Sequence, residues 1–316
     1  MTGTAAIIGA GLIGRSWAIA FARAGWTVKL WDSDPRAPER AQATMTELLD
    51  DLADNDLLDG QTRQAVQERI AASDTLAKAL EGADWVQENA PENVAIKQAL
   101  WAEMAPLAGL STILASSTSA IVPSQFTEGL SERERCLTAH PINPPYLVPA
   151  VELVPAPWTS RETMSRAEAV MHDIGQVPIM LRQEIDGFVV NRLQGALLDE
   201  AFRLVSDGIC GADDVDAAIR DGLALRWSFM GPFETIDLNA PDGVRDYIER
   251  YQPLYTRLFH SMQRRVAWDG PVADQVEGER RARVAKSDLA ERQRWRDRRL
   301  MALRRHKQEA GRRLGD

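Results

Sequence analysis

Three glycines spaced as G-x-G-x-x-G stand near the N-terminus, and this pattern constrains the fold more than any other part of the sequence. The segment GAGLIG, at residues 9–14, follows the short apolar run Ala5–Ile8. The apolar run is typical of a buried strand, and Ile13–Ala24 has the period of an amphipathic helix. Because the glycines lie between the two, we expect a strand, a tight turn and a helix in direct succession.

Each glycine has a separate purpose in such a unit. Gly9 permits the tight turn out of the strand, Gly11 lets the backbone approach a ligand, and Gly14 lets the helix pack close to the strand. The N-terminus of the helix then presents free N–H groups and the positive end of its dipole to an anion. The pattern therefore predicts a site for the pyrophosphate of a dinucleotide.

An acidic residue at the expected distance supports this interpretation. Thr27–Trp31 alternates and is rich in β-formers, and Asp32 follows it, 18 residues after Gly14. A carboxylate there accepts hydrogen bonds from ribose hydroxyls and repels a 2′-phosphate, which favours NAD over NADP. The alternative is a glycine-rich turn with Asp32 facing solvent.

Further apolar runs extend the predicted sheet. Val94–Ala105 is helical by period and lies between two of them, and the polar segment Asp50–Gln67 is predicted to be a helical excursion from the sheet. Alternation of strands and helices favours a mostly parallel sheet covered on both faces. The further strand candidates are Trp85–Glu88, Thr112–Ala115, Cys136–Ala139 and Val151–Val154.

The pattern changes near Asp186. No convincing strand follows Leu181, and the later segments are helical by period. The sequence therefore predicts an α/β fold, with a Rossmann-type domain over residues 1–185 and an all-α domain over residues 186–316. The hinge is expected at Glu184–Gly187, and the helices at Val190–Val205, Asp213–Arg220 and Val244–Met262.

Composition argues against several classes of protein. The net charge of −9 disfavours broad contact with nucleic acid or anionic lipid. Cys136 and Cys210 form no CxxC pair, which argues against a disulfide framework and a cysteine-rich zinc site, and fits the cytoplasm. No apolar stretch reaches the roughly 18 residues of a membrane helix, and the N-terminus lacks the pattern of a signal peptide. Since a cysteine-rich zinc pattern is also missing, we expect no metal site.

The segment Glu279–Arg313 is densely charged and rich in arginine, so contact with nucleic acid is one interpretation. Aspartate and glutamate are interspersed among the arginines, and mixed charge is usually a solvated face. Trp295, Leu300 and Leu303 indicate an amphipathic helix that packs on the rest of the protein.

One of the four histidines has a distinctive setting. His140 follows a predicted strand and begins the segment HPINPP, whereas His172, His260 and His306 lie in helical patterns. Prolines stiffen the loop, and loops at the carboxyl ends of strands bind ligands in open α/β sheets. Oxidation of a secondary alcohol needs a base whose pKa lies near neutral, which histidine provides.

Such a base needs a carboxylate that orients it, and the sequence offers one. Glu152 lies in an apolar strand, where a carboxylate is costly unless it is paired. The alternative is a sheet edge with Glu152 facing solvent. The hydroxyls of SSTS, at residues 116–119, could hold a substrate oxygen or cap a helix. Asn191 could reach over the cleft, or it could also be a cap.

These segments together resemble the L-3-hydroxyacyl-CoA dehydrogenase superfamily over nearly the whole chain. Within it, they are most similar to the subgroup of lambda-crystallin and L-gulonate 3-dehydrogenase. The segments that carry the resemblance are GAGLIGRSW (9–17), VQENAPENVAIK (86–97), ASSTSAIVPS (115–124), HPINPPYLVPAVELV (140–154), GFVVNRLQ (187–194), GLALRWSFMGP (222–232) and RQRWRD (292–297).

The resemblance implies a set of catalytic residues. His140 would be the base and Glu152 its partner, while Ser119 and Asn191 would contact the reacting oxygen of the substrate. It also implies a helical second domain that forms homodimers.

The resemblance further implies residues that bind NAD and substrate. Leu12 and Ile13 would meet the pyrophosphate through their backbone, and Glu92 and Lys97 would lie along the cofactor. Arg226 would bind a substrate carboxylate, since a guanidinium pairs with it through two parallel hydrogen bonds.

Three departures from the acyl-CoA enzymes bear on the substrate. The chain reads SSTS in place of SNTS, its loop after His140 is longer, and its cofactor half has no basic patch for CoA phosphates. These features favour a small free 3-hydroxy acid, with L-gulonate first. L-carnitine 3-dehydrogenase, which shares SSTS and LRWSFMG, and L-3-hydroxyacyl-CoA dehydrogenase are alternatives. A crystallin-like or NADH-binding protein is the alternative that is not an enzyme.

Overall fold

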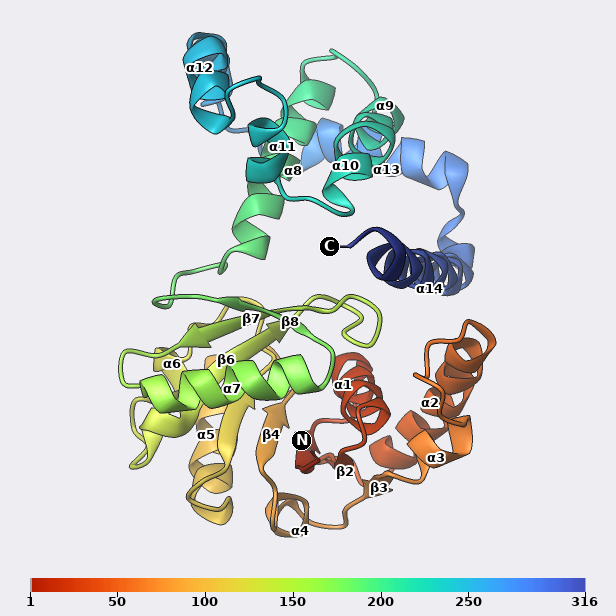
Figure 1. Cartoon of the computed structure of the whole chain (residues 1–316), viewed down its shortest axis with the longest axis vertical. Coiled ribbons are helices and arrows are strands. Elements are labelled where there is room, and N and C mark those ends of the chain that lie inside the picture. Colours follow the sequence, from red (N-terminus) through yellow and green to blue (C-terminus); the bar gives the residue numbers. More distant parts are fainter. Residues whose placement is uncertain (1, 316) are drawn as a thin grey trace. The chain divides into compact units, whose positions relative to one another are not determined.

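The computed structural model describes residues 2–315, and these form two compact units (Figure 1). The first contains the chain up to Asn191 together with Asp297–Arg305. The second contains Arg192–Arg296 and the residues from His306 onward. The boundary expected after residue 185 lies a few residues before this division, and the division also assigns a piece of the C-terminal helix to the first unit.

The first unit is built on one sheet. Within residues 2–315, eight strands pair in the order β3-β2-β1-β4-β5-β6-β7-β8, and only β7 and β8 run opposite to the rest. This mostly parallel sheet, followed by a helical second unit, confirms the predicted fold class. The strands are β1 (Thr4–Ile8), β2 (Thr27–Trp31), β3 (Ile70–Ala72), β4 (Trp85–Glu88), β5 (Ile113–Ser116), β6 (Cys136–Pro141), β7 (Ala150–Pro155) and β8 (Val177–Met180).

The two outermost strands, β3 and β8, were not among the predicted ones. Only Ile70 is buried in β3, and no residue of β8 is fully buried. An edge strand buries little and can carry a proline, as β8 does at Pro178, so the apolar signal on which strand prediction depends is weak.

Helices cover both faces of the sheet, and each face has its own apolar core. Alternate residues of β1 divide between the cores, with Ala5 and Ile7 in the core on one face and Ala6 and Ile8 in the core on the other. The helices of this unit are α1 (Leu12–Arg23), α2 (Ala37–Asp54), α3 (Arg63–Gln67), α4 (Leu76–Leu80), α5 (Val94–Met104), α6 (Ser124–Thr127) and α7 (Arg161–Asp173).

The prediction of one helical segment over Asp50–Gln67 is wrong. Helix α2 begins much earlier, at Ala37, and ends at Asp54, and α3 starts only at Arg63. Between them Asp56, Asp59 and Gly60 have positive φ angles, which interrupt a right-handed helix. Aspartate tolerates this conformation better than most residues, so the polar pattern concealed the break.

The described part of the second unit is helical. Two predicted helices differ from those observed: residues 213–220 divide between α9 and the π-helix η3, and Glu279–Arg313 contains a break at Val284, which is extended. The elements that follow the sheet are α8 (Val190–Ser206), α9 (Ala212–Ala217), η3 (Ala218–Leu223), α10 (Ala224–Trp227), α11 (Pro232–Asp237), α12 (Val244–Ser261), α13 (Gly270–Arg283) and α14 (Leu289–Leu314).

The middle turns of α14 belong to the first unit. Met301 is fully buried in the core that also contains α1 and α2, and Leu300 packs against that core. The expectation of an amphipathic helix packed on the body is thus confirmed, although through Met301 rather than Leu303, which is 44% exposed. Within residues 2–315, no helix is both long and apolar enough to span a membrane.

Candidate active site

The glycine-rich turn lies between β1 and α1, as predicted. Gly9 has a φ of +97°, which other residues rarely adopt, and a Cβ atom at Gly14 would overlap the carbonyl oxygen of Gly9. A Cβ atom at Gly11, in contrast, would meet no protein atom within 4 Å. Gly9 and Gly14 are therefore required by the fold itself, whereas the space beside Gly11 is open to a ligand.

The first turn of α1 is available for an anion. Its N-cap is Gly11, and within residues 2–315 no side chain caps the helix N-terminus. Asp32 lies against the turn, because its Oδ2 accepts a hydrogen bond of 2.7 Å from the N–H of Ala10. Backbone donors, open space beside Gly11 and an adjacent carboxylate fit a dinucleotide, with Leu12 and Ile13 in the turn that faces it.

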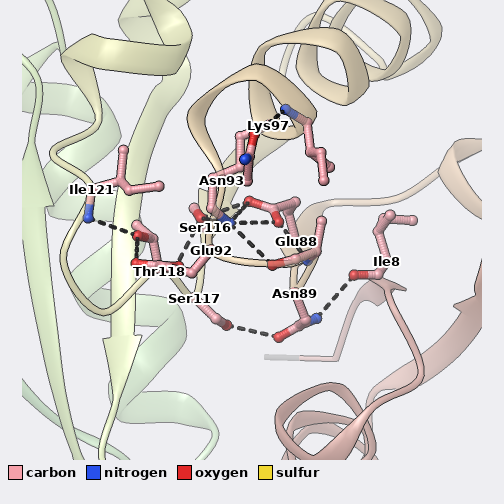
Figure 2. Close-up of polar contacts among 12 residues, drawn as sticks. Ile8, Glu88, Asn89, Glu92, Asn93, Lys97, Ser116, Ser117, Thr118 and Ile121 are labelled. Atoms are coloured by element: carbon pink, nitrogen blue, oxygen red, sulfur yellow. Dashed lines mark hydrogen bonds and ion pairs between the residues drawn. The ribbon is translucent and has the colours of Figure 1, made fainter.

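A buried ion pair lies at the carboxyl end of β4 (Figure 2). Lys97 of α5 donates to both carboxylate oxygens of Glu88, at 2.9 and 3.1 Å, and the two side chains are 1% and 0% exposed. Glu88 also accepts hydrogen bonds from Ser116, Trp101 and the N–H of Ala90. Lys97, which was expected along the cofactor, therefore has a partner within the protein.

Sequence analysis missed Glu88, although a signal existed. It is a carboxylate at the end of the apolar strand β4, the same signal that identified Glu152 in β7. Removing one partner of such a buried pair leaves an uncompensated charge, at a cost of about 3–5 kcal/mol. The pair thus fixes α5 against the carboxyl ends of β4 and β5.

Glu92 holds the loop that follows β5. Its Oε1 accepts hydrogen bonds from the Thr118 hydroxyl at 2.6 Å and from the N–H groups of Ala120 and Ser119 at 2.9 and 3.0 Å. Burial opposes ionisation, but these donors and the charge of Lys97 outweigh it and hold the pKa of Glu92 below its usual range. Glu92, expected along the cofactor, thereby sets the position of Ser119.

Ser117 belongs to a network that joins three strand ends (Figure 2). Its hydroxyl accepts hydrogen bonds from Trp17 and Gln87 and donates to Oδ1 of Asn89, at 2.8 Å. The amide of Asn89 in turn donates to the carbonyl oxygen of Ile8, at the end of β1. The second serine of SSTS is therefore occupied within the protein.

His140 and Glu152 form a hydrogen-bonded pair. They lie directly opposite each other in the antiparallel strands β6 and β7, and His140 Nδ1 is 2.7 Å from Glu152 Oε2. Glu152 is fully buried and His140 is 6% exposed. Because β7 lies between β6 and β8, the alternative with Glu152 facing solvent at a sheet edge is excluded.

The second oxygen of Glu152 binds the start of α8. Oε1 accepts hydrogen bonds from the N–H groups of Val189 and Val190, at 2.6 and 2.9 Å. Burial of the carboxyl group opposes ionisation, but the hydrogen bonds from His140, Val190 and Val189 outweigh it and lower the pKa of Glu152. A carboxylate held in this way keeps the proton of its histidine partner on Nδ1, so that Nε2 is available as a base.

Sequence analysis also missed Phe188. Its side chain is fully buried, and its ring centroid is 5.4 Å from that of His140. Its φ of +48° is unusual for a bulky residue and follows the positive φ of Gly187. A lone aromatic beside a hinge glycine was the available signal, but buried aromatics are common in cores. Phe188 therefore packs against the imidazole of His140 and immediately precedes the N–H groups that bind Glu152.

Ser119 and Asn191 are brought together at the same edge of the sheet. The Asn191 amide donates to the carbonyl oxygen of Ser119 at 2.7 Å. Strands β5 and β6 are adjacent and parallel, with Ser116 paired to Thr138, so the loop with Ser119 and the end of β6 with His140 share the carboxyl edge.

The remaining candidates are exposed side chains. Arg226 is exposed on α10 in the second unit, and His172, His260 and His306 are exposed on α7, α12 and α14. In the part of the chain that the structure describes, Cys136 and Cys210 are free, and no cluster of three metal-binding side chains occurs.

The fold and the turn define a class of protein, the dinucleotide-binding Rossmann-type proteins, and sequence comparison narrows it. The profile of the 3-hydroxyacyl-CoA dehydrogenase NAD binding domain matches residues 4–185, and that of the 3-hydroxyacyl-CoA dehydrogenase C-terminal domain matches residues 187–271. The chain therefore belongs to the 3-hydroxyacyl-CoA dehydrogenase family. NAD is the cofactor of this family, and its members are oxidoreductases acting on CH–OH groups.

Individual proteins show the same relationship. The lambda-crystallin homolog of Bos taurus is 41% identical over 95% of this chain and 94% of its own length. L-carnitine dehydrogenase of a Pseudomonas species is 34% identical over 95% of this chain and 92% of its own. A crystal structure of 5-formyl-3-hydroxy-2-methylpyridine 4-carboxylic acid 5-dehydrogenase, an NAD+-dependent dismutase, has a TM-score of 0.83 at 27% identity, covering 96% of this chain and 98% of its own.

Replacing Gly11 by alanine tests NADH binding without changing the stability of the fold. Because the added Cβ meets no protein atom, Gly11→Ala should unfold like the wild type. It should bind NADH at least about tenfold more weakly, since the methyl group enters the space of the pyrophosphate. Gly14→Ala is the comparison, and should lose about 1–3 kcal/mol of stability by overlap with Gly9. Thermal unfolding and NADH titration measure both, and normal NADH affinity in Gly11→Ala would contradict this assignment.

Glu152→Gln should alter the pH dependence of stability. Its folded pKa lies below its unfolded value of about 4.3, so the ionised group stabilises the fold fully above that pH, and the contribution is lost as pH falls through the folded pKa. At neutral pH the variant should be about 2 kcal/mol less stable than the wild type, and the gap should close in acid. Urea unfolding measures this, with exposed Glu103→Gln as the control. A gap independent of pH would refute the assignment.

Proposed function

We propose that this chain oxidises the 3-hydroxyl of a small free 3-hydroxy acid with NAD. The observation that carries the proposal is the buried pair of His140 and Glu152, with Nδ1 and Oε2 2.7 Å apart. An imidazole oriented by a carboxylate is the arrangement that a base for alcohol oxidation requires.

Each residue around the pair has a part in this reaction. His140 takes the proton of the hydroxyl group, and Glu152 orients the imidazole and stabilises the imidazolium that forms. Ser119 and Asn191 contact the alcohol oxygen and stabilise the charge of the developing carbonyl. Glu92 acts through Ser119, since it fixes the loop that presents it. Bound NAD supplies the hydride acceptor.

L-gulonate is the substrate that we place first. The lambda-crystallin relatives are 39–41% identical over 95–97% of the chain, above the 34% of the L-carnitine dehydrogenases. Arg226, in LRWSFMGP, offers a guanidinium that would bind the carboxylate of the acid. Ser117, which replaces the asparagine of the acyl-CoA enzymes, is engaged with Trp17 and Asn89, so it supports the subgroup rather than a direct contact with substrate.

L-carnitine is the second candidate, because L-carnitine dehydrogenases are 34% identical over most of the chain. A 3-hydroxyacyl-CoA is the third. A crystallin-like or NADH-binding protein without turnover is disfavoured, because the four side chains proposed for catalysis are all present.

We also propose that the protein acts as a homodimer. The second unit exposes large apolar side chains on and around α10–α12, a set that monomers seldom leave in water. The exposed apolar side chains include Trp227, Phe229, Phe233, Leu238, Tyr251 and Phe259. Sedimentation as a single protomer at micromolar concentration would refute the proposed dimer.

We propose a cytoplasmic location, because the two cysteines are free, as is usual for proteins in a reducing compartment.

Turnover with NAD should distinguish the substrates. We expect formation of NADH with L-gulonate, slower or absent turnover with L-carnitine and L-3-hydroxybutyrate, and the lowest kcat/KM with 3-hydroxybutyryl-CoA. The absorbance of NADH measures all four. A clear preference for the CoA ester would contradict the free acid, and NADH binding without turnover on any substrate would favour the binding protein.

His140→Ala should remove the base and leave the cofactor site intact. We expect kcat to fall by a factor of about 100 to 10,000 while the affinity for NADH stays within error of the wild type. His172→Ala, on the exposed face of α7, is the matched control and should keep full activity. Wild-type turnover in purified His140→Ala would contradict this mechanism.

A further inference from the structure

The C-terminal helix α14 lies beyond both family profiles, the second of which ends at residue 271. Its middle turns, Asp297–Arg305, nevertheless belong to the same compact unit as the sheet. None of the residues proposed for catalysis lies on this helix.

One contact reaches the loop that joins β6 to β7. The guanidinium of Arg304 donates from Nη1 to the carbonyl oxygen of Tyr146 at 2.8 Å. Tyr146 lies in residues 142–149, which we call the β6–β7 loop. This loop begins just after His140 and ends just before Glu152. It is thus the covalent connection between the proposed base and its carboxylate partner.

Several contacts within the first unit hold the loop. Tyr146 and Leu147 are buried, the N–H groups of Leu147 and Val148 bond to Pro144, and Gln176 donates to the carbonyl oxygen of Pro145. Tyr146 is the residue of this loop that binds α14, at the other end of the sequence, through Arg304.

A second arginine binds the same carbonyl oxygen. Arg23, at the end of α1, donates to it from Nη1 at 3.1 Å. Burial and the charge of Arg304 lower the pKa of Arg23 to about 10, which leaves it protonated at neutral pH. The two like charges repel each other, and the carboxylate of Asp59 partly offsets this repulsion. The apolar packing of the helix on the core comes from Met301 and Leu300, so the hydrogen bond of Arg304 is a separate, polar contact.

We propose that Arg304 is a positioning residue: by binding the carbonyl oxygen of Tyr146, it holds the β6–β7 loop and thereby keeps His140 and Glu152 in their catalytic arrangement. The contact is a charge-assisted hydrogen bond in a partly buried setting, where such bonds are stronger than in water. The arginine-rich helix thus has a specific function in the site without contacting the substrate.

The test compares two neighbouring arginines of α14 in the full-length protein. Arg304→Met keeps the apolar stem and removes the guanidinium. Arg305→Met is the matched control, because Arg305 is 48% exposed and pairs at 3.1 Å with Asp56, which is 74% exposed. Amide hydrogen exchange of residues 142–149, kcat, KM and NADH affinity are measured for both variants.

We expect the β6–β7 loop to exchange about tenfold faster in Arg304→Met than in the wild type, because its opening loses one restraint. We expect kcat to fall about tenfold, with KM and NADH affinity unchanged, since the base is displaced and the binding groups are not. Arg305→Met should match the wild type in all four. Wild-type exchange in Arg304→Met, or equal effects in both variants, would overturn the proposal.

A conservative variant covers the case in which Arg304→Met does not fold. Arg304→Gln keeps a polar side chain but removes the charge and the reach of the guanidinium, so faster loop exchange in it supports the proposal and wild-type exchange overturns it. The kinetic arm rests on the proposed function, but the exchange arm does not. A wild-type protein without turnover would count against the function alone, while an active wild type with an unaffected loop in Arg304→Met would count against the positioning role alone.

Discussion

The hydrogen bonds of the Glu152 carboxylate organise the candidate site. A fully buried carboxylate is unfavourable unless each oxygen is satisfied, and here one oxygen meets His140 while the other meets two N–H groups at the start of α8. The same group therefore orients the His140 imidazole and fixes the segment that carries Phe188 and Asn191. The positive φ of Phe188 is stabilised by this arrangement, because it turns the backbone so that both following N–H groups point to one oxygen.

Two more glutamates use the same principle along the carboxyl edge of the sheet. Glu88 is neutralised by Lys97, and Glu92 is satisfied by one hydroxyl and two N–H groups of the loop after β5. Glu88 thus joins β4 to α5, and Glu92 joins the loop before α5 to the loop after β5. The groups that would touch substrate, Ser119 and Asn191, are positioned by residues that need not touch it.

Much of this could be predicted from sequence, and the limits have physical causes. The glycine pattern, Asp32 and the apolar runs define the Rossmann unit because their spacing is dictated by the backbone. The pairing of His140 with Glu152 followed from the cost of an unpaired carboxylate, and the same argument would have found Glu88. Strands β3 and β8, the break after Asp54 and the contact of Arg304 with Tyr146 depend on edges, left-handed backbone and long-range packing, which local patterns do not encode.

The position of Asp32 has a consequence for changing the cofactor preference. Its Oδ2 accepts the N–H of Ala10, inside the glycine turn, and its Oδ1 accepts the N–H of Asp34. An engineer who replaces Asp32 with a small neutral residue, to admit the extra phosphate of NADP, removes the acceptor that shapes the turn as well as the charge. A successful redesign has to supply a neutral oxygen in its place, as asparagine would, so cofactor choice and loop geometry cannot be altered independently in this protein.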